Sequence, residues 1–284
     1  MTRLSTGDIC GISSSLETYD LDLVAKTGRT LLGVACHAGG VNEETITPLI
    51  KPFSIHVVPI TAGQGVISNF SETVAAILEF TGFSVQVSEK PDVSGVAQAF
   101  ERGADAVMMS DDHRFVGINL KTRCVVDNSE ATGRVFAAAL DLMARGINER
   151  EALVMGCGPV GQAAARTLLS FNARVSLYDS NLATARLLKD KLGKGRAVRV
   201  ETEIKAALLN HEYILEATPS ADTIPDELLG NSRVVAAPGV PLGVSKTGCK
   251  ILNDRLIHDK LELGVAAMAI SLVPGDGKTG GYFE

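Results

Sequence analysis

The chain has 284 residues, of which 45% are hydrophobic and 21% are charged, and this length can form two domains with separate cores. Its net charge of −6 provides no general attraction for phosphate backbones, so nucleic-acid binding is disfavoured as the main role. The opening segment MTRLSTGDIC lacks the apolar core of a signal peptide, and the apolar stretch Gly264–Val273 is too short to span a bilayer, so we expect a cytoplasmic protein. Five cysteines without a C-x-x-C pair and five scattered histidines predict reduced thiols and no metal site.

Helical spacing predicts two N-terminal helices, Leu16–Gly28 and Thr30–His37, and a loop that contains Pro48 and Pro52. An α/β unit with its own parallel sheet follows, because strand and helix patterns alternate. Its predicted strands are Ser54–Ile60, Phe83–Val87 and Ala106–Met109, and its predicted helices are Ser71–Phe80 and Val93–Glu101. A hairpin-like segment then leads into a long amphipathic helix, Gly133–Arg145, that we expect to join two domains.

The first strand-to-helix turn of this unit, TAGQGVISNF, contains Gly63, Gly65 and Ser68 and nearly repeats a phosphate-binding fingerprint. No acidic residue ends the following strand, so we interpret the turn as a site for a small anion, such as a substrate carboxylate, at a helix N-terminus. Plain capping of the helix by Asn69 and its neighbours explains the same residues equally well.

The strand Ala106–Met109 ends in five polar residues, Ser110 to Arg114, at the sheet edge where parallel sheets bind ligands. Adjacent carboxylates at Asp111 and Asp112 could bind an ammonium group or remove its proton before hydride transfer. A solvated turn is the alternative. Asn119 and Asn128 flank the hairpin-like segment, and either amide could fix a polar substrate.

The second half opens with a glycine-rich motif between a predicted strand, Ala152–Met155, and a predicted helix, Gln162–Ser170. Gly156, Gly158 and Gly161 have G-x-G-x-x-G spacing, which allows a tight turn, close approach of a pyrophosphate and close helix packing. Pro159 and Val160 lie between these glycines, at the N-terminus that would bind the phosphates. The motif predicts a dinucleotide site.

Asp179 ends the next predicted strand, Arg174–Tyr178, and follows Gly161 by 18 residues. A carboxylate at this place accepts the ribose hydroxyls of NAD and repels the 2′-phosphate of NADP, and no arginine follows it. We therefore expect NAD. An ordinary glycine-rich turn with a solvated Asp179 is the alternative.

Strands and helices continue to alternate up to strand Arg233–Ala237, which predicts a parallel sheet covered by helices. The fold class is therefore α/β with two domains: an N-terminal α/β substrate domain over residues 1–147 and a C-terminal Rossmann dinucleotide-binding domain over 148–260. Residues 261–284 would form a helix that packs at the domain joint, plus a tail.

Several segments together resemble the pyrrolysine synthase family. They are VPITAGQGVISNF at 58–70, PDVSG at 91–95, MMSDDHRF at 108–115, EATPSADTIP at 216–225 and APGVP at 237–241. The resemblance implies NAD as cofactor, a homodimer, and Asp111 at the reacting amine. It further implies two groups of binding residues. Substrate would contact Thr61, Asn69, Phe70 and Asn128, and the cofactor would contact Thr218, Pro219, Ala237 and Pro238 besides the glycine-rich motif.

The resemblance also implies a reaction. Family members use NAD to oxidise the terminal amine carbon of L-lysine-Nε-(3R)-methyl-D-ornithine to an imine or semialdehyde, which then cyclises to pyrrolysine. The alternative function is that of a general NAD-dependent amino-acid or imine oxidoreductase with a smaller substrate. A non-catalytic NAD sensor is a third possibility, and it would need no acid at Asp111.

Overall fold

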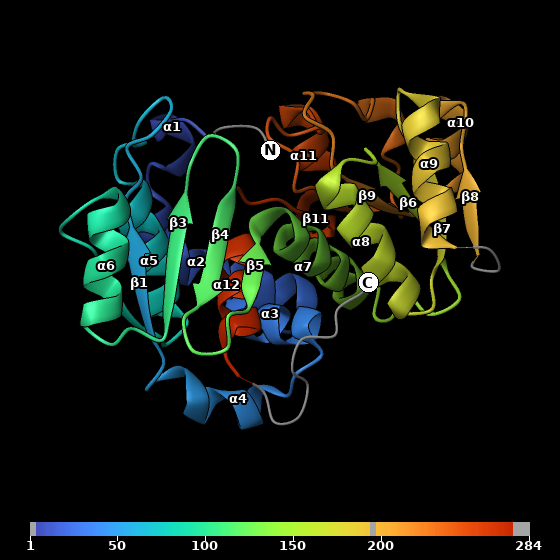
Figure 1. The fold of residues 1–284 in the computed structure, drawn as a ribbon. Coiled ribbons are helices and arrows are strands. Elements are labelled where there is room, and N and C mark those ends of the chain that lie inside the picture. Colours follow the sequence, from blue (N-terminus) through green and yellow to red (C-terminus); the bar gives the residue numbers. More distant parts are fainter. Residues whose placement is uncertain (1–3, 194–196, 275–284) are drawn as a thin grey trace.

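The computed structural model describes residues 4–193 and 197–274, in which two sheets lie side by side and helices pack between and around them (Figure 1). The two-domain α/β fold class expected from the sequence is confirmed. Within the described residues, no helix is both long enough and apolar enough to cross a membrane. Residues 275–284 of the predicted tail lie outside the described part of the chain.

The first sheet has the strand order β2-β1-β3-β4-β5, in which β1 to β3 are parallel and β4 and β5 extend it as antiparallel strands. Its strands are β1 (Ser54–Val58), β2 (Ser84–Val87), β3 (Ala106–Ser110), β4 (Phe115–Asn119) and β5 (Val125–Asp127). Helices α5 (Phe70–Phe80) and α6 (Asp92–Glu101) connect the parallel strands. Side chains of β1 alternate between faces, since Ile55 joins the main core while Val58 packs with Ala99 of α6.

The second sheet has six parallel strands in the order β11-β10-β9-β6-β7-β8, the doubly wound order of a Rossmann domain. Its strands are β6 (Glu151–Met155), β7 (Arg174–Tyr178), β8 (Val198–Val200), β9 (Tyr213–Glu216), β10 (Val234–Ala236) and β11 (Leu256–Ile257). Its helices are α8 (Pro159–Ser170), α9 (Leu182–Leu192), α10 (Ile204–Asn210) and α11 (Lys246–Leu252), with 3-10 turns at Asp226–Leu228 and Asn253–Arg255. The central strands are buried on both faces, which explains their continuous apolar sequence.

In the part of the chain that the structure describes, four helices precede the first sheet. They are α1 (Thr6–Ile9), α2 (Ile12–Thr27), α3 (Leu31–Gly39) and α4 (Glu43–Ile50). The loop predicted around Pro48 is wrong, because α4 contains that proline. The Asn42 side chain caps α4 by accepting from the Glu44 N–H at 2.8 Å, and Ile46 and Ile50 bury one face. Burial of this face over a helix of only 8 residues outweighs the single backbone bond that an interior proline removes.

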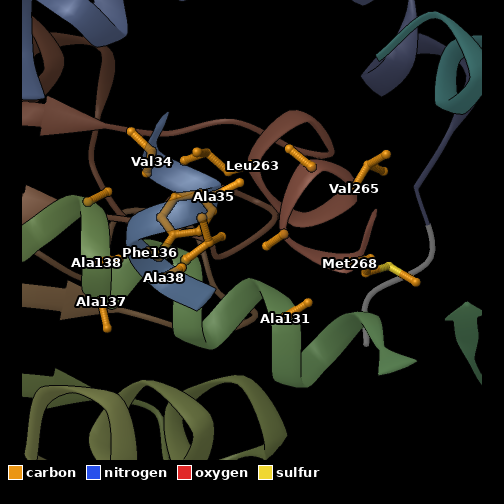
Figure 2. Close-up of a cluster of buried hydrophobic side chains, with 14 of the residues drawn as sticks. Val34, Ala35, Ala38, Ala131, Phe136, Ala137, Ala138, Leu263, Val265 and Met268 are labelled. Atoms are coloured by element: carbon orange, nitrogen blue, oxygen red, sulfur yellow. The ribbon is translucent and has the colours of Figure 1, made fainter. Parts of the chain in front are cut away.

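Helices α7 (Asn128–Met143) and α12 (Glu262–Leu272) pack together with α3 at the joint between the sheets. Figure 2 shows Phe136 of α7 facing Val34 and Ala35 of α3, next to Leu263 of α12. On its other side α7 meets α8 at Gly133, where a Cβ would lie 2.2 Å from the Val160 carbonyl oxygen. The long joining helix and the returning terminal helix, both predicted, thus form one apolar connection between the two sheets.

Candidate active site

A cavity of about 410 Å³ opens between the carboxyl ends of the two sheets. The N-terminal half contributes Asp111 and its neighbours after β3, and the C-terminal half contributes Gly158 after β6 and Thr218 after β9. The two sequence motifs singled out above therefore open onto the same space. Its volume is within the range of small-molecule binding pockets.

Each glycine of the G-x-G-x-x-G motif has a different role. Gly156 has a φ of +87°, which favours glycine, and a Cβ there would lie 2.6 Å from the Ala217 carbonyl oxygen. A Cβ on Gly161 would lie 1.8 Å from the carbonyl oxygen of Gly156, so this residue allows α8 to pack against the turn. A Cβ on Gly158 would meet no atom within 4 Å. The space beside Gly158 is therefore open, as the close approach of a pyrophosphate requires.

The other predicted cofactor residues divide into two sets. Pro159, Val160, Thr218, Pro219 and Pro238 line the cavity with Gly158. Ala237 does not; it is buried, and its carbonyl oxygen accepts a hydrogen bond from Nδ1 of His258 at 2.7 Å. Asp179 lies outside the cavity lining and is held at the end of β7, where its carboxylate accepts from the Cys157 N–H at 2.8 Å and the Asn181 N–H at 2.9 Å.

Asp111 lies in the tight turn between β3 and β4 and is exposed to the cavity. Its Oδ1 accepts from the backbone N–H groups of His113 and Arg114, both at 2.7 Å, which leaves Oδ2 outside these two bonds. The two N–H donors, Arg114 first, lower the pKa of the Asp111 carboxyl. Asp111 is consequently an anion at neutral pH, suited to pairing with an ammonium group more than to accepting its proton.

The neighbouring carboxylate explains the glycine-rich turn after β1. Oδ2 of Asp112 accepts from the Gln64 N–H at 2.7 Å, and a Cβ on Gly63 would lie 2.0 Å from this oxygen. The anion that this turn binds is therefore the side chain of Asp112. The alternative, capping by Asn69, is found only in position: Asn69 is the N-cap residue of α5, but its backbone is left-handed, with a φ of +63°, and its side chain makes no capping hydrogen bond.

The predicted substrate residues are only partly brought together. Phe70 and Asn128 line the cavity, and the Phe70 ring packs edge-on against Phe115 at a centroid distance of 5.5 Å. Thr61 and Asn69 are exposed outside the cavity lining. The hydroxyl and N–H groups of Thr61 both donate to Asp92.

Asn119 has a structural role and no contact with the cavity. It is buried, and its side chain donates to the Leu272 carbonyl oxygen at 2.8 Å and accepts from the N–H groups of Lys121 and Thr122. These bonds close the turn between β4 and β5 and attach it to the end of α12.

Lys260 is a cavity residue that sequence reasoning missed. It lies between β11 and α12, and its Nζ contacts the Asp8 carboxylate of α1 at 2.6 Å. This ion pair is the main reason that the pKa of Asp8 falls to about 2. No local pattern marks Lys260 as a site residue, because only the return of α12 to the domain joint brings it to the cavity.

Comparison with known proteins supports both halves of this arrangement. Residues 8–126 match a family model described as "Pyrrolysine biosynthesis protein PylD, N-terminal domain", and residues 128–225 match "Alanine dehydrogenase/PNT, C-terminal domain". The pyrrolysine synthase of Methanosarcina acetivorans is 31% identical over 273 residues, covering 96% of this chain and 100% of that relative. The pyrrolysine synthase of Methanosarcina barkeri is 30% identical over 277 residues, covering 96% and 98%.

Solved structures share the fold at low sequence identity. The quinate dehydrogenase of Corynebacterium glutamicum, in complex with NAD, has a TM-score of 0.54 at 14% identity and covers 78% of this chain and 93% of its own. The shikimate 5-dehydrogenase of Thermus thermophilus, in complex with NADP(H) and shikimate, has a TM-score of 0.51 at 16% identity and covers 78% and 92%. These likenesses show that the chain shares the fold of these structures, with two α/β halves.

Proposed function

The chain belongs to the pyrrolysine synthase family, and we propose that this oxidoreductase uses NAD to oxidise the terminal amine of L-lysine-Nε-(3R)-methyl-D-ornithine. The resulting imine or semialdehyde would then cyclise to pyrrolysine. The observation that carries the proposal is that Gly158 of the dinucleotide motif and the acidic turn at Asp111 line one cavity. A dehydrogenase needs this juxtaposition, because cofactor and substrate must meet.

The residues of the second sheet fit a dinucleotide. The open space beside Gly158 and the N-terminus of α8 would hold the pyrophosphate, and Asp179 at the end of β7 would accept the adenosine ribose hydroxyls. The Asp179 carboxylate would repel a 2′-phosphate, which supports NAD over NADP. When bound, NAD supplies the acceptor for the hydride that leaves the amine-bearing carbon.

The charges around the cavity fit a long substrate with amino-acid groups at both ends. Asp111 would pair with the ammonium group to be oxidised and hold it towards the second sheet. Lys260 and Arg114 also line the cavity and can bind carboxylates. Apolar side chains such as Phe70 and Val66 line the same cavity and would pack against the aliphatic chain.

The lowered pKa of Asp111 bears on how the amine loses its proton. An amine with an ordinary pKa near 10.4 is only about 0.04% neutral at pH 7, so a proton must leave before oxidation. We propose that Asp111 orients the ammonium group and that water at the exposed turn accepts the proton. Ring closure needs little further help, because a well-placed intramolecular amine acts at very high effective molarity.

A single assay tests the proposal. Purified protein is mixed with NAD and lysyl-methylornithine, and NADH absorbance and product mass are followed together, with lysine and ornithine as smaller control substrates. Equal amounts of NADH and pyrrolysine are expected with lysyl-methylornithine alone. NADH formation with the smaller amino acids and none with lysyl-methylornithine would favour a general amino-acid oxidoreductase, and cofactor binding without any turnover would indicate an NAD sensor.

We also propose a homodimer, which rests on the family relationship, and sedimentation of the purified chain tests it. A monomer at micromolar concentration would contradict it.

A further inference from the structure

Glu216 is a carboxyl residue with no solvent exposure at the last position of β9. It does not line the cavity, but the residues that follow it, Ala217 to Pro219, do. Burial raises the pKa of Glu216. A buried carboxyl group needs hydrogen-bond partners, and here they come from the cavity wall itself.

The Oε1 atom of Glu216 accepts two hydrogen bonds from Thr218. One comes from the Thr218 N–H at 2.9 Å and the other from the Thr218 hydroxyl. The Thr223 hydroxyl lies 3.3 Å from Oε1 and also 3.3 Å from the Gly243 carbonyl oxygen, to which it can donate instead. The other oxygen, Oε2, packs against backbone, since a Cβ on Gly239 or Gly243 would lie 2.7 or 2.6 Å from it.

These bonds fix the direction of the Thr218 hydroxyl. The Thr218 hydroxyl donates to Oε1 when Glu216 is ionised. It also donates to Oε1 when Glu216 is protonated, because Oε1 accepts both Thr218 bonds and the carboxyl proton would then lie on Oε2. The Thr218 oxygen then has only lone pairs left for the cavity that Thr218 lines. A ligand atom that meets this oxygen must therefore be a hydrogen-bond donor.

The topology indicates which donor. The strand order reverses between β6 and β9, and a dinucleotide lies across such a reversal. The pyrophosphate site follows β6, and Asp179 draws the adenosine towards β7. The nicotinamide half must then extend the other way, over the ends of β9 and β10, where Thr218 and Gly239 line the cavity.

We propose that Glu216 is a positioning residue that presents the Thr218 hydroxyl oxygen as an acceptor for the carboxamide N–H₂ of the nicotinamide. This inference rests on the proposed use of NAD. It goes beyond that proposal by assigning a polarity to one atom of the cavity wall and by giving a purpose to a carboxyl group that no solvent or substrate reaches.

Equilibrium binding tests the inference without any turnover. NADH and the reduced 3-acetylpyridine analogue, in which a methyl group replaces the carboxamide N–H₂, are titrated by calorimetry into the intact protein and three variants. The wild type is expected to bind NADH about fivefold more tightly than the analogue, the value of one ordinary hydrogen bond. Thr218→Val keeps the shape but lacks the oxygen, so this preference should disappear, whereas Thr218→Ser should retain it.

Glu216→Met tests the positioning role, because it has a similar volume but lacks the oxygen that accepts both Thr218 bonds. The Thr218 hydroxyl can then turn its hydrogen elsewhere, so the preference for NADH should be lost in this variant. A Glu216→Met protein that keeps the preference would overturn the assignment of Glu216. A Thr218→Val protein that still prefers NADH fivefold would overturn the assignment of Thr218. The assignment would also be overturned if Thr218→Val left cofactor binding unchanged and raised the substrate KM. Failure of the wild type to bind NADH at all would refute the proposed function instead.

Discussion

Alanine substitutions at Gly158 and Gly161 should have opposite effects on folding, although both residues belong to one motif. At Gly158 the backbone has a φ of −70° and a ψ of −173°, which any residue adopts, and a Cβ would meet no atom within 4 Å. At Gly161 a Cβ would lie 1.8 Å from the Gly156 carbonyl oxygen, far inside van der Waals contact. The missing side chain of Gly158 leaves space that a ligand can occupy, whereas the missing side chain of Gly161 leaves space for the Gly156 carbonyl group.

The expected magnitudes follow from this geometry. Gly158→Ala restricts the unfolded chain and should raise stability by about 0.4–1 kcal/mol, or about 1 to 3 °C in Tm. The new methyl group would occupy the pyrophosphate space, and an overpacking cost of about 1–3 kcal/mol corresponds to a roughly 5- to 150-fold weaker Kd for NADH. Gly161→Ala forces the backbone of the turn to move, so an overpacking cost of the same size should lower the free energy of unfolding.

Thermal melts without ligand, together with NADH titrations, separate the two effects. The reasoning is refuted if Gly158→Ala melts several degrees below the wild type, or if it binds NADH with unchanged affinity. A Gly161→Ala protein as stable as the wild type would show that the turn relaxes more easily than its geometry indicates.

Four further substitutions probe the rest of the cavity and its support. Asp111→Asn removes the proposed ammonium partner and should lower kcat/KM by about 100-fold or more, with an unchanged Kd for NADH; unchanged turnover would refute this role. Lys260→Met should raise the substrate KM about tenfold, whereas Asp8→Asn keeps the ammonium group and should not; equal effects would argue against carboxylate binding. Burial, and then the charge of Asp259, raises the pKa of Glu262 to about 7. The folded protein therefore binds this proton more tightly than the unfolded chain does, and it should lose stability as pH rises from about 4 through about 7. Urea unfolding at about pH 5 and about pH 8 should show a smaller decrease in the free energy of unfolding for Glu262→Gln than for the wild type. An identical decrease in the two proteins would exclude Glu262 as the cause.

Local patterns were sufficient for most of the fold. The second sheet follows its predicted alternation closely, and β7 has the predicted bounds. The errors fall where two local rules compete, as in α4, where buried Ile46 and Ile50 outweigh the helix-breaking tendency of Pro48. The division into domains at residues 147 and 260 remains a prediction.

The site was predictable in part. Asp111 and the glycine motif could be found because ligand-binding residues follow the carboxyl ends of parallel strands. Asp112, next to Asp111 in sequence, binds the chain's own turn at Gln64, and no pattern distinguishes the two carboxylates. Both residues line the cavity, and the path of the hairpin between β3 and β4 decides which of the two carboxylates is bonded to the turn at Gln64.

The sequence alone determined the chemistry that depends on neighbours along the chain: the dinucleotide turn, the acid that ends β7, and the polar residues that end β3. The tertiary structure decided what depends on packing of distant segments. It brings Lys260 to the cavity beside Asp8, it buries Glu216 beneath Thr218, and it faces the two sheets towards each other across α7 and α12. The physical reason is that hydrogen bonds of turns and caps are local, whereas burial of an apolar face depends on every segment that packs against it.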